Sequence, residues 1–296
     1  MTELPVPELP QRIELSVAEV FGTAVSSDPL GDELATVALD AARAAAAIHL
    51  AGFGGLRDRV DTKSSATDMV SEVDRRAEEA VVAIIDASRP GDAILGEEGT
   101  ARGGSTGVRW VVDPLDGTTN FLFGIPAFSV SIAAEIDGAA RVGVVIDPTR
   151  AETWAAVAGR GARLNGQRTM VATGRSELST ALVATGFGYR AERRSQQGRV
   201  AATVLPAVRD LRRFGSAALD LCWVAGGRVD AYYEWGLNPW DLSAGRLICD
   251  EAGARTGILT GQTIIASVPA LYEGLAELLV SAGARDFEEG NEERHW

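Results

Sequence analysis

The chain has 296 residues, and its 28 Lys and Arg against 41 Asp and Glu give a formal net charge of −13. Hydrophobic residues make up 46% of the chain, which is enough for a full globular core. This charge argues against nucleic acid or an anionic membrane surface as the main partner, because neither offers positive charge to carboxylates. The sequence has no uninterrupted apolar run of membrane-spanning length, no signal peptide in its acidic, Pro-rich start, and too few cysteines for a disulfide framework. We therefore expect a protein of the reducing cytoplasm.

The first half of the chain begins with helical patterns and continues with strands. Residues 1–30 hold four prolines and no sustained apolar period, which predicts a loosely held extension. From Asp32 to about residue 50 apolar residues recur at helical spacing, and a second helical pattern follows over residues 73–85. Strand patterns come next, at residues 93–95, 108–112, 128–136, 141–146 and 152–157.

The second half alternates strands and helices more evenly. We predict a boundary near residue 170, with an α+β half at 31–170, an α/β half at 171–284 and a polar tail at 285–296. The expected strands are 181–185, 211–214 and 229–234, and the expected helices are 195–207, 216–225, 239–252 and 269–282. This alternation indicates a layered α/β protein.

The sequence excludes several kinds of chemistry. Its two histidines, His49 and His295, fall on a helix and in the polar tail, where a structural role is expected for each. They supply no histidine pair for zinc, and no GxGxxG or Walker motif is present. Chemistry must therefore depend on carboxylates, hydroxyls and hard metal ions.

The most informative stretch follows the expected strand at 109–112 and reads DPLDGTTNF over residues 113–121. Asp-Pro and Asp-Gly are common turn dipeptides, so a plain surface turn is the alternative. However, ligands of α/β proteins usually bind at the carboxyl ends of strands. Asp113 and Asp116, with a carbonyl between them, can share one or two hard cations there.

Three further carboxylates occupy similar places. Glu97 follows a short apolar strand between two glycines, although adjacent glutamates are more often a solvated pair. Asn238 and Pro239 specify a helix start that puts Asp241 in the first turn, where the helix dipole alone can explain it. Asp74 lies three residues after Ser71, a spacing that also fits a capping box.

Taken together, these carboxylates favour a metal site. Glu97, Asp113, Asp116 and Asp241 come from separate loops without a histidine, a set that suits magnesium better than zinc or copper. A polar loop that holds Lys63 precedes a helix expected to begin near residue 67 or 68.

These motifs resemble those of the inositol monophosphatase family of magnesium-dependent, lithium-sensitive phosphatases. The matching segments are KSSATDMVSEVD at 63–74, GEEG at 96–99, DPLDGTTNF at 113–121, residues 214–236, and NPWDLSAG at 238–245. The resemblance covers residues 32–282. The chain departs from the family pattern at two places. One is the N-terminal extension, and the other is the short segment 254–268, where family members commonly carry a longer loop between two strands.

The resemblance implies an αβαβα sandwich, a homodimer, and two or three Mg²⁺ ions in each active site. The implied ligands of the first ion are Glu97, Asp113 and the carbonyl oxygen of Leu115. Those of the second ion are Asp113, Asp116 and Asp241, while Glu97 also contributes to a weaker third site. Asp74 and Thr118 match the pair that orients the attacking water, with Lys63 as an accessory residue.

The resemblance also implies the substrate side of the site. The phosphate is expected to contact Asp116 and the amides of Gly117 and Thr118. Gly215, Ser216 and Ala217 open a helix that faces the substrate. Glu234 is expected to accept hydroxyls of the leaving alcohol, although spacing alone also fits an exposed glutamate at a strand end.

The implied activity is hydrolysis of a small-molecule phosphate monoester, with myo-inositol 1-phosphate or a related polyol phosphate as the leading substrate. Fructose 1,6-bisphosphate, histidinol phosphate and 3′-phosphoadenosine 5′-phosphate remain alternatives. Some bacterial relatives act in transcription complexes, so a regulatory binding role is an alternative of a different class.

Overall fold

The computed structural model describes residues 10–11, 13–22, 28–53, 60–62, 69–171, 174–259 and 262–284, with only the backbone described at 60–62 and 69–71. Lys63, His295 and the predicted tail at 285–296 lie outside the described residues.

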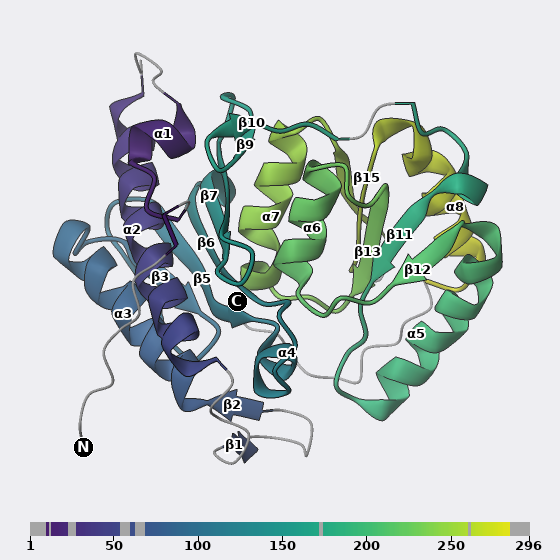
Figure 1. The fold of residues 1–296 in the computed structure, drawn as a ribbon, viewed down its shortest axis with the longest axis horizontal. Helices are drawn as coiled ribbons and strands as arrows, with labels where there is room; N and C mark the ends of the chain where they lie inside the picture. Colours follow the sequence, from purple (N-terminus) through teal and green to yellow (C-terminus); the bar gives the residue numbers. More distant parts are fainter. Residues whose placement is uncertain are drawn as a thin grey trace.

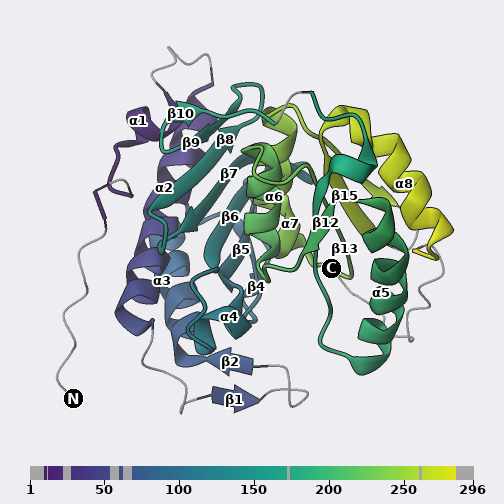
Figure 2. The same cartoon turned by 45° about the vertical axis from the view of Figure 1, so that its right-hand side comes forward.

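The chain forms five layers of alternating helices and sheets, which confirms the αβαβα sandwich (Figure 1). The outer helices on one side are α2 (Pro29–Gly52) and α3 (Glu72–Ser88), and those on the other side are α5 (Ala191–Val204) and α8 (Tyr272–Ser281). Between the two sheets lie α6 (Ala217–Ala225) and α7 (Pro239–Glu251), which the turned view shows in the centre of the molecule (Figure 2).

The large sheet has eight strands in the order β10-β9-β8-β7-β6-β5-β3-β4. Its members are β3 (Ala93–Gly96), β4 (Ala101–Arg102), β5 (Val108–Asp116), β6 (Ser129–Ile136), β7 (Ala139–Asp147), β8 (Glu152–Val157), β9 (Ala162–Leu164) and β10 (Gln167–Arg168). Strands β3 and β5 are parallel neighbours, so their carboxyl ends meet at one edge. The pairing of β5 with β6 shifts register between Asp113 and Asp116, which marks a bulge where the predicted site begins.

The second sheet has five strands in the order β12-β11-β13-β15-β14. Its members are β11 (Leu182–Thr185), β12 (Asp210–Arg212), β13 (Ala231–Trp235), β14 (Arg255–Leu259) and β15 (Thr263–Ser267). Strand β11 runs parallel to both β12 and β13, and β15 is antiparallel to β13 and β14. The short elements α4 (Thr118–Leu122), η1 (Leu178–Thr180), η2 (Leu205–Ala207) and η3 (Pro269–Leu271) complete these two halves.

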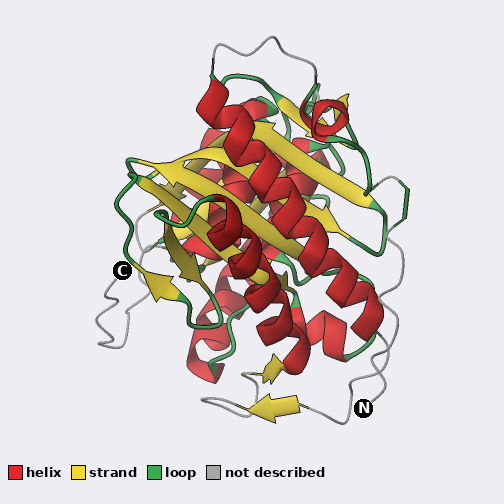
Figure 3. Cartoon of the chain, turned by 90° about the vertical axis from the view of Figure 1, so that its left-hand side faces the viewer, coloured by secondary structure: helices red, strands yellow, loops and turns green. Residues whose placement is uncertain are grey.

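Helices α2 and α3 cover the outer face of the large sheet (Figure 3). The alanine-rich side of α2 is buried, which lets helix and sheet approach closely. By length and composition α2 could cross a membrane, but 56% of its most apolar window is buried inside the protein, as in the core helix of a soluble protein. Its apolar character is therefore explained by packing.

Two local expectations need correction. Helix α1 (Val17–Phe21) begins with a capping box between Ser16 and Glu19, and Ile13 and Val20 are fully buried in the core with α2. Residues 13–22 of the expected extension are therefore held by the core. The second correction concerns α3, which begins at Glu72 instead of near residue 67, after a hairpin of β1 (Val60–Thr62) and β2 (Met69–Ser71).

Candidate metal and phosphate site

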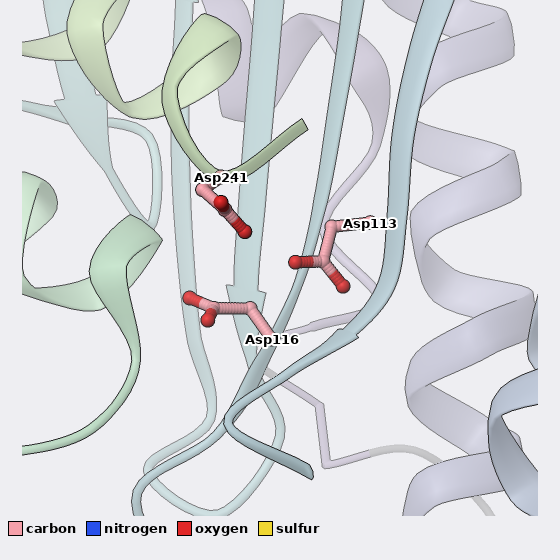
Figure 4. A group of neighbouring side chains, drawn as sticks. All are labelled: Asp113, Asp116 and Asp241. Atoms are coloured by element: carbon pink, nitrogen blue, oxygen red, sulfur yellow. The ribbon is translucent and has the colours of Figure 1, made fainter. Parts of the chain in front are cut away.

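Three aspartates from two elements meet between the layers. Asp113 and Asp116 come from the end of β5 and Asp241 from the first turn of α7, and their side chains lie close together (Figure 4). One oxygen of each carboxylate lies within 4.8 Å of the others, a spacing that could hold a metal ion. The structure thus brings together three of the four carboxylates expected to bind metal.

Asp116 is held by the start of helix α6. Its Oδ2 atom accepts a hydrogen bond from Ser216 Oγ at 2.6 Å and from the Ala218 N–H at 2.8 Å, and the Ala217 N–H donates to Oδ1 at 3.3 Å. A helix N-terminus stabilises a nearby negative charge, so α6 fixes and stabilises the ionised carboxylate.

Asp113 is fixed by its own loop and by helix α2. Its Oδ1 atom accepts a hydrogen bond from the Leu115 N–H at 3.0 Å. The next carbonyl group, that of Pro114, accepts a hydrogen bond from His49 Nε2 at 2.8 Å. His49 is fully buried against Phe121 and Phe128, and burial lowers its pKa to about 4. The imidazole is therefore neutral and structural, as expected, and it supports the loop between two of the carboxylates.

Asp241 takes part in a capping box at the start of α7. The Asn238 N–H donates to Asp241 Oδ2 at 2.6 Å, and Pro239 occupies the first turn as expected. This cap uses one oxygen of Asp241 and fixes the side chain toward the other carboxylates.

Glu97 is beside this group but is not one of the three clustered aspartates. It follows β3 directly, and its N–H donates to the Val112 carbonyl of β5 at 3.1 Å. Its side chain shares a hydrogen bond with Asp113 and lines the same cavity. The parallel pairing of β3 and β5 thus explains how two motifs distant in sequence come together.

The electrostatics of the cluster are those of a cation site. Burial, followed by repulsion from neighbouring carboxylates, raises the pKa of Asp113 well above its usual range, and the pKa of the more exposed Glu97 shifts in the same direction. Burial and the Asp116 charge raise the pKa of Asp241 to about 8. No Lys or Arg among the described residues forms an ion pair with Asp113, Asp116 or Asp241. An oxygen-only donor set of this kind fits a hard divalent cation.

The carboxylates open into a cavity of about 190 Å³. It is lined by Gly117 and Thr118, which were expected near the phosphate, and by Gly215 and Ala217, which were expected to face the substrate. Gly117 has φ +95°, and a Cβ there would lie 3.0 Å from the Ala127 carbonyl oxygen, so the close approach requires glycine. Thr118 Oγ1 donates to the Leu115 carbonyl oxygen at 3.0 Å.

Glu234 lies at the end of β13 and lines the same cavity from the second sheet. Its Oε2 atom accepts a hydrogen bond from Tyr232 Oη at 2.7 Å, and burial raises its pKa to about 7. A Cβ at Gly186 would lie 1.7 Å from Glu234 Oε2, so glycine at the end of β11 makes room for this carboxylate. Glu234 is therefore a cavity residue and not an exposed strand-end glutamate.

Asp74 and Ser216 occupy supporting positions. Asp74 is buried in the first turn of α3, and its charge contributes to the raised pKa of Glu97. Ser216 is fully buried, and its hydroxyl bonds Asp116 and caps α6. Ser216 was expected to contact the substrate, but its buried side chain instead donates a hydrogen bond to Asp116.

The cavity wall also has a basic and aromatic part that no sequence motif indicated, which comprises Phe187, Tyr189, Arg193, Arg213 and Trp235. Arg193 packs over the Trp235 ring, with its guanidinium carbon 4.6 Å from the ring centroid. Both arginine side chains pass over glycines, Arg213 over Gly215 and Arg193 over Gly236. Arg213 lies two residues before Gly215, a pattern too common to identify a site, and Arg193 meets Gly236 only in the folded chain.

The chain is similar to known proteins of one family. A model of the inositol monophosphatase family matches residues 31–289. Inositol-1-monophosphatase SuhB of Mycobacterium tuberculosis (strain H37Rv) is 46% identical over 237 residues, covering 75% of this chain and 80% of that protein. Nus factor SuhB of Pasteurella multocida is 40% identical over 246 residues, covering 80% of this chain and 92% of that protein.

Solved structures give the same answer for the fold. The structure of extragenic suppressor protein SuhB from Bartonella henselae is 36% identical, covers 82% of this chain and 96% of that chain, and superposes with a TM-score of 0.78. The family match includes both sheets and every carboxylate of the site. The chain therefore belongs to the inositol monophosphatase family, and it is a phosphoric monoester hydrolase.

Proposed function

We propose that the protein hydrolyses the phosphate monoester of a polyol, with myo-inositol 1-phosphate as the leading substrate, and that the reaction requires Mg²⁺. The proposal rests on one observation: possible metal ligands and a possible acceptor for substrate hydroxyls line the same cavity. Carboxylates from β5 and α7 offer oxygen ligands to a cation, and Glu234 from the second sheet offers an acceptor for hydroxyls. A polyol phosphate has both complementary parts.

The proposed ligands are Glu97, Asp113, the Leu115 carbonyl oxygen, Asp116 and Asp241, which would hold two or three ions. When bound, Mg²⁺ stabilises the negative charge that develops on the phosphoryl and leaving oxygens. The chain's own groups do the positioning. Asp74 and Thr118 are proposed to orient the attacking water, and the N–H groups of Gly117 and Thr118 are proposed to contact the phosphate.

The test is phosphate release in the presence and absence of Mg²⁺ from four substrates: myo-inositol 1-phosphate, fructose 1,6-bisphosphate, histidinol phosphate and 3′-phosphoadenosine 5′-phosphate. The Asp116→Asn variant serves as the blank. A clear preference for the inositol ester supports the proposal. A preference for another ester keeps the metal chemistry and rejects the substrate, and no release from any of the four counts against both.

Glu234→Gln is expected to raise KM for myo-inositol 1-phosphate about tenfold, because an amide accepts hydrogen bonds from hydroxyls more weakly than a carboxylate. Glu234 is proposed to contact only the alcohol part of the substrate, so kcat should change less. The matched control is p-nitrophenyl phosphate, whose leaving group has no hydroxyls to bind. An equal rise of KM for both esters would show that Glu234 does not recognise the alcohol.

A regulatory role is the second candidate, since one 40% identical relative is named a Nus factor. Binding to a protein or RNA partner does not need the buried carboxylates. Co-purification of the wild type and of Asp116→Asn with RNA polymerase separates the two roles. Binding that survives in the inactive variant would show a second function beside catalysis.

A further inference from the structure

Glu78 is a buried carboxylate that neither the metal site nor the substrate side includes. It lies on α3 with only 5% of its surface exposed. Its Oε2 atom accepts a hydrogen bond from the Glu98 N–H at 2.9 Å. Its Oε1 atom accepts from the Thr100 N–H at 3.1 Å and from Thr100 Oγ1 at 2.6 Å. All three donors belong to the turn that carries Glu97.

This turn is built around the Glu78 carboxylate. The Gly96 N–H donates to the Thr100 carbonyl at 2.7 Å and closes the turn, and Gly99 has φ +112°, which favours glycine. A Cβ at Gly96 would lie 2.4 Å from Glu78 Oε2, so the first glycine leaves space for the carboxylate. The GEEG motif thus contains two glycines that the turn needs for different reasons.

Glu97 is consequently held from two sides. On one side its own N–H is bonded to the Val112 carbonyl of β5, and on the other the next N–H is bonded to Glu78. Asp74 lies one turn before Glu78 on the same buried face of α3. One helix face therefore carries the residue proposed to orient water and the residue that fixes the Glu97 turn.

We propose that Glu78 is a positioning residue that holds Glu97 in its place for cation binding. The inference rests on the proposed function, in which Glu97 is a magnesium ligand. A charged acceptor of three hydrogen bonds holds the turn more firmly than a neutral one. Glutamine at this position keeps the shape but turns an NH₂ group toward an N–H donor, and alanine removes every acceptor.

The experiment titrates Mg²⁺ into the metal-free protein by calorimetry, without substrate, for the wild type, Glu78→Gln, Glu78→Ala and Thr100→Val. Glu79→Ala is the matched control, because Glu79 is the exposed neighbour on the same helix. Supporting residues around metal ligands typically contribute about 10- to 100-fold in metal affinity. We expect at least about a tenfold loss for the Glu78 variants, a smaller loss for Thr100→Val, and wild-type binding for Glu79→Ala.

Circular dichroism and thermal unfolding identify the variants that remain folded, and the Mg²⁺ concentration for half-maximal activity gives a second measure. A merely structural role would lower the melting temperature and leave the Mg²⁺ affinity of the folded protein unchanged. If the folded Glu78→Gln and Thr100→Val proteins have Mg²⁺ affinities within twofold of the wild type, this inference is overturned, while the proposed function still stands. A wild type that neither binds Mg²⁺ nor releases phosphate would overturn the proposed function, and this inference with it.

Discussion

Asp116→Asn is expected to reduce kcat/KM for the preferred phosphate ester by about 10²- to 10³-fold or more, the effect typical of losing one group that stabilises a developing charge. Asn removes one negative charge from a cluster whose other members are already buried and mutually repelling. It also places an NH₂ group near the Ser216 hydroxyl and the N–H groups that open α6. The measurement is steady-state phosphate release over a range of Mg²⁺ concentrations, because weak metal binding and slow turnover respond differently to added ion.

The matched control for this prediction is Ser216→Ala. It removes the hydroxyl that donates to Asp116 and caps α6, but it leaves the carboxylate charge in place. The loss of such a cap costs about 1 kcal/mol of stability, so the thermal midpoint should fall by a few degrees while activity falls less than tenfold. If Asp116→Asn kept activity close to that of Ser216→Ala, the carboxylate would not be a metal ligand.

The second large effect is expected in the pH dependence of stability, through His49. Its folded-state pKa is about 4, against 6.5 for an ordinary histidine. Between these values the unfolded chain binds a proton that the folded protein does not, so stability is fully present above pH 6.5 and is lost as pH falls toward 4. From pH 7.5 to pH 5 this group should cost about 2 kcal/mol of unfolding free energy.

His49→Gln provides the comparison, because Gln can still donate to the Pro114 carbonyl oxygen but does not titrate. Urea unfolding of both proteins at pH 7.5 and pH 5 gives two changes in unfolding free energy, and their difference isolates His49. The carboxylates of the cavity also titrate, but they do so in both proteins and largely cancel. Equal pH dependence in the two proteins would mean that His49 is accessible to protons in the folded state.

Much of the site could be predicted because its motifs coincide with element ends. Asp113 and Asp116 lie at the end of a buried strand, and Asn238 with Pro239 marks a helix start. These signals are local, and together they grouped the four carboxylates, while the family resemblance added the roles expected of Asp74, Thr118 and Glu234. The layered fold followed from the alternation of strand and helix periods for the same reason.

What the sequence did not predict depends on contacts between distant segments. Ser216 was expected at the substrate, yet it is turned inward by Asp116, 100 residues earlier in the chain. Arg193 lines the cavity where Gly236, 43 residues later in the chain, leaves space for its side chain. Glu78 looks like any polar residue of an amphipathic helix until the turn after β3 is in place. The hydrophobic periodicity of a helix indicates which of its faces is buried, but it does not indicate which residues that face contacts.

The order of the two sheets along the chain has a consequence for its synthesis on the ribosome. The large sheet is complete in sequence by Arg168, but the carboxylate of Asp241 and the cap that α6 gives to Asp116 are made much later. The second sheet can be completed only later in synthesis, because β13 pairs with β15, which ends at Ser267. A nascent chain that has finished the large sheet therefore still lacks Asp241, one of the three clustered aspartates. If Mg²⁺ is bound as proposed, a chain truncated before α7 is expected to bind it more weakly than the full chain.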